Sequence, residues 1–124
     1  MIILIDTSTP VCCLTVIDGG EKQHFEWQAD RKLAKGLLAF IKDKVGDFHS
    51  ISGIGVMKGP GSFTGLRIGI TVANTLSESL EVPIVGAEGE NWQELALDRL
   101  KNNQSDKIVL PEYGAEANIT KPRK

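Results

Sequence analysis

The sequence has few of the residues that mark metal-binding, disulfide-rich or membrane proteins. It contains two cysteines, adjacent at Cys12 and Cys13, and two histidines. Neighbouring residues of a strand point to opposite faces, so the two thiols are poorly placed to bridge each other or to bind zinc. No segment approaches the roughly 18 apolar residues of a membrane span, and the first residues lack the basic flank of a secretory signal. We therefore expect a cytoplasmic protein with no metal, no cofactor and no membrane contact.

The sequence also lacks a surplus of positive charge. Its 14 Lys and Arg face 16 Asp and Glu, which gives a formal net charge of -2. Such a chain has no long-range attraction for phosphate backbones, so direct, tight binding to nucleic acid is not expected. A length of 124 residues accommodates one domain. We expect one lobe over residues 1–110 and a loosely ordered tail over 111–124.

Hydrophobic patterning predicts an α/β fold with a mixed five-stranded sheet. The first three strands form a meander with a turn at Asp18-Gly19-Gly20. Asp30, Ser62 and Asn91 are expected to cap the three helices, and Gly46 to end the first of them. The expected strands are 2–5, 11–17, 21–27, 51–57 and 84–86, with 108–110 as a further edge strand, and the expected helices are 30–45, 62–80 and 91–100.

A glycine-rich turn, Gly59-Pro60-Gly61-Ser62, lies between the expected fourth strand and second helix. A strand-to-helix turn of this kind can bind phosphate at the helix N-terminus. However, a Walker A loop needs a Gly-Lys pair where this chain has Thr64 and Gly65, and a dinucleotide fingerprint fails at Thr64 too. The turn is therefore predicted to be structural. Asp6, Thr7 and Ser8 after the first strand remain weak candidates for a nucleotide site.

Hydrolytic chemistry has little support in the sequence. His24 and His49 are isolated from any serine or carboxylate at a persuasive spacing, and Ser62 has no evident base. A metal-dependent nuclease would need further carboxylates beside Asp6. The residues thus predict no catalytic group.

The expected second helix has more apolar surface than one packing face requires. Its apolar residues sweep roughly 200° of a helical wheel, against about 100° for one face. Glycines inside a helix need a compensating reason, and Gly65, Gly69 and Ala73 form one row that would let another backbone approach. The second contact is the first helix, another protein or both, and a homodimer is one such solution. The predicted partner-binding residues are Leu33, Gly36, Leu37, Phe40, Gly65, Leu66, Gly69, Ile70 and Ala73.

The eleven residues from Gly59 to Gly69 resemble the signature of the bacterial TsaB (YeaZ) family. Their sequence is GPGSFTGLRIG, and it directly follows the expected strand 51–57 and Lys58. Ile5-Asp6-Thr7-Ser8 and Val82-Pro83-Ile84-Val85-Gly86 resemble further segments of that family, so the resemblance covers about residues 1 to 100. It implies an actin-like, RNase-H-like lobe. It also implies a non-catalytic role beside a TsaD-like catalytic subunit and a TsaE-like ATPase, which together form N6-threonylcarbamoyladenosine (t6A) in tRNA. The pairing with TsaD would use a bundle of helices.

Two departures from the family pattern matter. Members are usually nearly twice as long, and their second half opens on a strand with Asp-Ala-Arg, where this chain has Ile108 to Tyr113. We expect a minimal or truncated member without the second lobe. The alternatives are an autonomous actin-like, ATP-binding phosphotransferase and, less favoured, a glycoprotease-like hydrolase.

Overall fold

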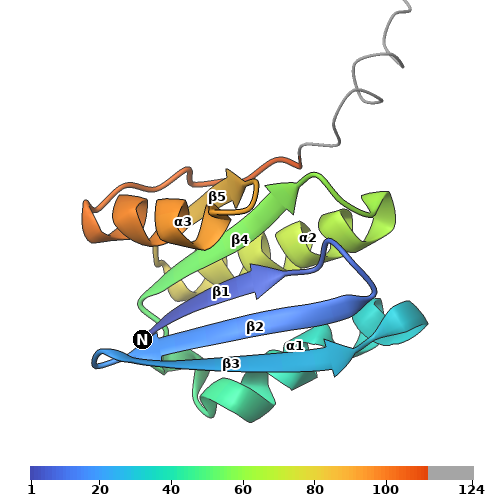
Figure 1. The fold of residues 1–124 in the computed structure, drawn as a ribbon. Coiled ribbons are helices and arrows are strands. Elements are labelled where there is room, and N and C mark those ends of the chain that lie inside the picture. Colours follow the sequence, from blue (N-terminus) through green and yellow to red (C-terminus); the bar gives the residue numbers. More distant parts are fainter. Residues whose placement is uncertain (112–124) are drawn as a thin grey trace, which may run out of the picture.

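The computed structural model describes residues 1–111, which form one sheet flanked by helices (Figure 1). The strands lie side by side in the order β3-β2-β1-β4-β5. A 3₁₀ turn precedes α1 and another follows it. The elements are β1 (Ile2–Asp6), β2 (Val11–Asp18), β3 (Glu21–Gln28), α1 (Leu33–Val45), β4 (Gly53–Gly59), α2 (Phe63–Leu80), β5 (Ile84–Glu88) and α3 (Trp92–Lys101).

The sheet combines two directions. β1, β2 and β3 pair antiparallel, whereas β4 pairs parallel with both β1 and β5. Parallel neighbours need a crossover, and the crossovers here contain α1 and α2. The predicted meander that leads into helical crossovers is confirmed, as is the mixed five-stranded sheet.

The helices divide between the two faces of the sheet. α1 and α2 lie behind it in Figure 1, while α3 lies in front of β4 and β5. Gly55 of β4 lies on the face that α3 covers, because a Cβ added to it would be 3.0 Å from the Ala96 Cβ of α3. No helix of residues 1–111 covers β2 and β3 on that face (Figure 1). The core therefore lies mainly between the sheet and the α1/α2 layer.

Two of the predicted helix signals are confirmed and two are wrong. Ser62 caps α2 by accepting a hydrogen bond from the Gly65 amide at 3.4 Å, and Gly46 ends α1 with φ 83°. Asp30 does not cap α1: it has φ 50° and begins a 3₁₀ turn (Asp30–Lys32), and its carboxylate accepts from Gln28 instead. Asn91 stands at the start of α3, but its side chain makes no capping bond.

The predicted strand at 108–110 is also wrong. The buried Val109 has its backbone bound by a side chain: its amide donates to Asn74 Oδ1 at 2.9 Å, and its carbonyl accepts from Asn74 Nδ2 at 3.0 Å. Asn74 thus takes the backbone hydrogen bonds that a neighbouring strand would have made with this segment. The predicted tail, apart from Pro111, lies outside the described residues. Within residues 1–111, no helix has both the length and the hydropathy of a membrane span.

Candidate partner-binding surface

The glycine-rich turn is packed against the end of β1. The Ser62 amide donates to the Ser8 carbonyl at 2.8 Å, and a Cβ added to Gly61 would lie 2.8 Å from that same oxygen. Asp6 also binds Ser8, because its Oδ1 accepts hydrogen bonds from the Ser8 amide at 2.9 Å and from the Ser8 hydroxyl at 2.6 Å. The predicted structural role of the turn agrees with this packing, in which Asp6 and Ser8 bind each other.

Thr7 contacts the glycine row of α2. Its hydroxyl donates to the Gly65 carbonyl at 2.7 Å, and a Cβ on Gly69 would collide with the Thr7 side chain. A Cβ added to Gly65 would likewise collide with the Thr7 carbonyl oxygen. The prediction that Gly65 and Gly69 face another protein is therefore wrong, since Thr7, the residue after β1 in the same chain, packs against both. Thr7, one of the weak nucleotide-site candidates, is also fully buried.

The remaining predicted partner residues are also largely covered within the chain. On α1, Gly36 and Phe40 pack against Trp27 of β3, with the Phe40 and Trp27 ring centroids 5.3 Å apart. Gly36 and Phe40 are both half-buried by this contact, and their place at a partner interface stays a prediction. The other buried members of the predicted set are Leu33, Leu37, Leu66, Ile70 and Ala73.

What stays accessible is a groove between the outer sides of α1 and α2. Ile68 and Val72 of α2 are half-buried there, and Ala34 of α1 faces them across a groove of about 390 Å³. Leu38 lies one helical turn beyond Ala34 and is 46% exposed. Thr64, Arg67 and Thr71 complete the lining. We call this surface the α1/α2 groove.

A second hollow of about 630 Å³ continues the α1/α2 groove toward the start of both helices. The two hollows share Thr64 and Ile68, so they form one channel along the helix pair. Arg31, Lys32 and Arg67 line this channel, and among residues 1–111 Asp30 is the one carboxylate in its lining. An apolar floor with basic edges suits a helical partner that has an apolar ridge and acidic flanks.

The sequence reasoning missed one cluster on the other face of the sheet. Cys13, His24 and Glu26 come together there from β2 and β3. Strand alternation puts His24 and Glu26 on one face of β3, but only the pairing register with β2 adds Cys13. Burial is the main cause that raises the pKa of the Cys13 thiol, and the carboxylates of Asp6 and Glu26 raise it further. Burial also raises the pKa of Cys12 to about 12, which makes that thiol a poor nucleophile.

Comparison with known proteins agrees with the fold and the turn. Residues 31–88 match the family model described as TsaD, tRNA N6-adenosine threonylcarbamoyltransferase. The matched part runs from the 3₁₀ turn before α1 to the end of β5, so it includes both helices of the α1/α2 groove.

Two curated relatives carry the name tRNA threonylcarbamoyladenosine biosynthesis protein TsaB. The one from Haemophilus influenzae is 27% identical over 112 residues, covering 87% of this chain and 47% of the relative. The one from Escherichia coli is 34% identical over 90 residues, covering 68% of this chain and 38% of the relative. The chain thus spans less than half the length of these relatives.

A solved structure shares the arrangement of strands and helices. YeaZ from Pseudomonas aeruginosa superposes with a TM-score of 0.62 at 27% identity, covering 70% of this chain and 42% of that one. The actin-like, RNase-H-like fold implied by the sequence is thereby confirmed. Together with the glycine-rich turn packed on β1, these matches show that the chain belongs to the TsaB/YeaZ family.

Proposed function

We propose that this chain is an accessory subunit in the biosynthesis of t6A in tRNA and performs no chemistry itself. The names of its relatives support the pathway. The packing of the turn supports the accessory role, because the Thr7 hydroxyl is bound to Gly65, and Asp6 to Ser8, as parts of the fold. Both cysteines are free thiols, which suits work in the reducing cytoplasm.

The partner in this proposal is a TsaD-like catalytic subunit that docks along the α1/α2 groove. The observation that carries it is the groove in which Ala34 of α1 faces the half-buried Ile68 and Val72 of α2, with the exposed Leu38 one helical turn beyond Ala34. The two helices have 13 and 18 residues. A matching pair of helices could cover this surface as a four-helix bundle. Such a contact would bury on the order of 1,200 to 2,000 Å², the range of stable interfaces.

Three further elements belong to the same proposal. A TsaE-like ATPase joins the complex through the catalytic subunit, and tRNA is reached indirectly, in keeping with the net charge of -2. Without its partner, the chain forms a homodimer through the α1/α2 groove, because an uncovered apolar surface favours self-association. Light scattering with and without the catalytic subunit would distinguish the two assemblies.

The experiment that tests the docking surface compares two leucines of equal exposure. Leu38 on α1 and Leu95 on α3 are both 46% exposed, but they lie on opposite faces of the sheet. We expect Leu38→Glu to reduce affinity for the TsaD-like subunit at least about tenfold, since it puts a charge into an apolar contact. Leu95→Glu should bind as the unaltered protein does. Equal binding by both folded variants, measured by calorimetry, would exclude the α1/α2 groove.

A further inference from the structure

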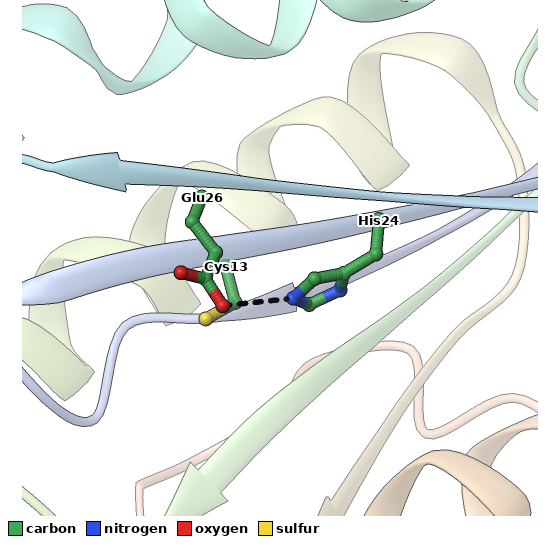
Figure 2. Close-up of side chains that lie close together, drawn as sticks. All are labelled: Cys13, His24 and Glu26. Carbon is green, nitrogen blue, oxygen red and sulfur yellow. Dashed lines mark hydrogen bonds and ion pairs between the residues drawn. The ribbon is translucent and has the colours of Figure 1, made fainter.

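Figure 2 shows three side chains that could bind a metal ion on the sheet face left open beside α3. The Cys13 thiol projects from β2, and the His24 ring and Glu26 carboxylate project from β3. Cys13 and Glu26 face each other directly in the β2–β3 register. One potential ligand atom from each residue lies within 4.8 Å of the other two, and His24 Nε2 is 3.3 Å from Glu26 Oε2.

We propose that Cys13, His24 and Glu26 bind a divalent transition-metal ion of the zinc class. Thiolate, imidazole and carboxylate are the three ligand types that zinc uses, whereas magnesium and calcium are bound by oxygen. Three protein ligands leave the fourth tetrahedral position to water. The site joins β3, which is an edge strand, to β2.

The spacing is close to that of a tetrahedral centre. Bonds of about 2.0 to 2.3 Å place neighbouring ligand atoms about 3.3 to 3.6 Å apart. The His24 and Glu26 atoms already have this separation. The Cys13 sulfur needs to approach by at most about 1.5 Å, from a limit of 4.8 Å. Rotation of the exposed Glu26 side chain and of the Cys13 side chain, which need not disturb the backbone, can provide that movement.

The residues behind His24 are arranged as they are behind metal-bound histidines. Such a histidine usually donates its second ring N–H to an oxygen, which fixes the orientation of the ring. Here His24 Nδ1 lies 3.1 Å from the hydroxyl of Thr15, a buried residue of β2. The same hydroxyl accepts from Gln93 Nε2 of α3 at 3.2 Å. With the proton on Nδ1, the Nε2 lone pair points toward Glu26, and a cation between them removes their repulsion.

The local charge also favours a dication. Asp6 of β1 pairs in register with Cys13, so its carboxylate lies next to the cluster. Metal binding replaces the S–H bond of Cys13 with an S–metal bond and releases the proton to solvent. The thiolate and the Glu26 carboxylate then bind a doubly positive ion, and the negative charge of Asp6 lies nearby. Cys12 does not compete, because it is buried on the opposite face of the sheet.

The test is a titration of the full chain with Co²⁺, a spectroscopic probe for zinc sites, in a buffer free of thiols. We expect saturable binding of one ion, with a thiolate-to-cobalt charge-transfer band and the intense visible absorption of a tetrahedral site. Cys13→Ser should abolish that band, and His24→Gln should weaken binding at least about tenfold. Thr15→Val, which removes only the hydroxyl behind the ring, should weaken binding about tenfold. Excess Zn²⁺ should displace the cobalt.

Two control variants keep the test specific. His49→Gln removes the other histidine, which is exposed beside Asp47, and Cys12→Ala removes the other thiol. Both should bind cobalt as the unaltered chain does. Absence of a charge-transfer band in the folded unaltered protein would overturn the proposal, as would a band that survives Cys13→Ser or is lost in Cys12→Ala. Circular dichroism would confirm that each variant is folded.

Discussion

Gly69→Ala tests how the glycine row of α2 is used. In a helix whose face is open, replacing glycine by alanine raises stability by about 1 kcal/mol. At Gly69, however, the new methyl group would lie 3.0 Å from Thr7 Cβ and 2.9 Å from Thr7 Cγ2. Thr7 is fully buried and bonded to the Gly65 carbonyl, so it has little freedom to move away.

The expected magnitude follows from three contributions. Overpacking a core position by one methyl group costs about 1 to 3 kcal/mol. Displacing the Thr7 hydroxyl from the Gly65 carbonyl costs about 1 kcal/mol more. The helix propensity of alanine returns about 1 kcal/mol. We therefore expect the free energy of unfolding of Gly69→Ala to fall by about 1 to 3 kcal/mol.

Urea denaturation of four proteins measures this effect: the unaltered chain, Gly69→Ala, Thr7→Ala and the double variant. Thr7→Ala makes room for the new methyl group, so the two changes should couple favourably by at least about 1 kcal/mol. A Gly69→Ala protein that is more stable than the original, or changes that simply add, would show that the row faces solvent or a partner and would refute the packing on β1.

Two further predictions concern the Arg99–Asp106 ion pair and nucleotide binding. Hydrogen bonds from Arg99, and from the Gly86 amide at 2.8 Å, hold the pKa of Asp106 below its usual value. The stabilisation is therefore complete above the unfolded pKa of about 4 and is lost as pH falls through the lower folded pKa. Asp106→Asn should destabilise the protein by about 1 to 2 kcal/mol at neutral pH. The difference between the two proteins should become smaller in acid. Denaturation at several pH values measures it, and a difference of the same size in acid would contradict the prediction. Calorimetry of the chain with ATP and magnesium should detect no micromolar binding, because the Thr7 hydroxyl and the Asp6 carboxylate bind within the fold; micromolar affinity would favour the phosphotransferase alternative.

The sequence predicts the order of elements because the residues that begin and end its helices act through local contacts. Gly46 ends α1 and Ser62 caps α2 through contacts within four residues, so neither depends on the rest of the fold. Asp30 fails as a cap because the chain enters α1 through a 3₁₀ turn, and the carboxylate binds Gln28 behind it. A capping residue type before an apolar pattern therefore predicts that a helix follows, but it does not predict that the side chain makes the capping hydrogen bond.

The candidate site was harder to predict because periodicity says which residues share a face, but not what covers it. Gly65, Gly69 and Ala73 do form one row, yet Thr7, from the start of the chain, packs against both of its glycines. The accessible α1/α2 groove instead uses Ala34, Leu38 and Thr71, which do not stand out by residue type. The cluster of Cys13 with His24 likewise depends on a strand register that spacing alone does not give.

The proposed role as an accessory subunit is tested most directly by t6A formation in a reconstituted reaction. The measurement is the rate of tRNA modification by the TsaD-like subunit and its ATPase, with this chain present, omitted, or replaced by Leu38→Glu or Leu95→Glu. We predict modification only when the chain is present, with loss in Leu38→Glu and full rate in Leu95→Glu. An undiminished rate without the chain, or a full rate with the folded Leu38→Glu protein, would contradict the proposed role and its docking surface.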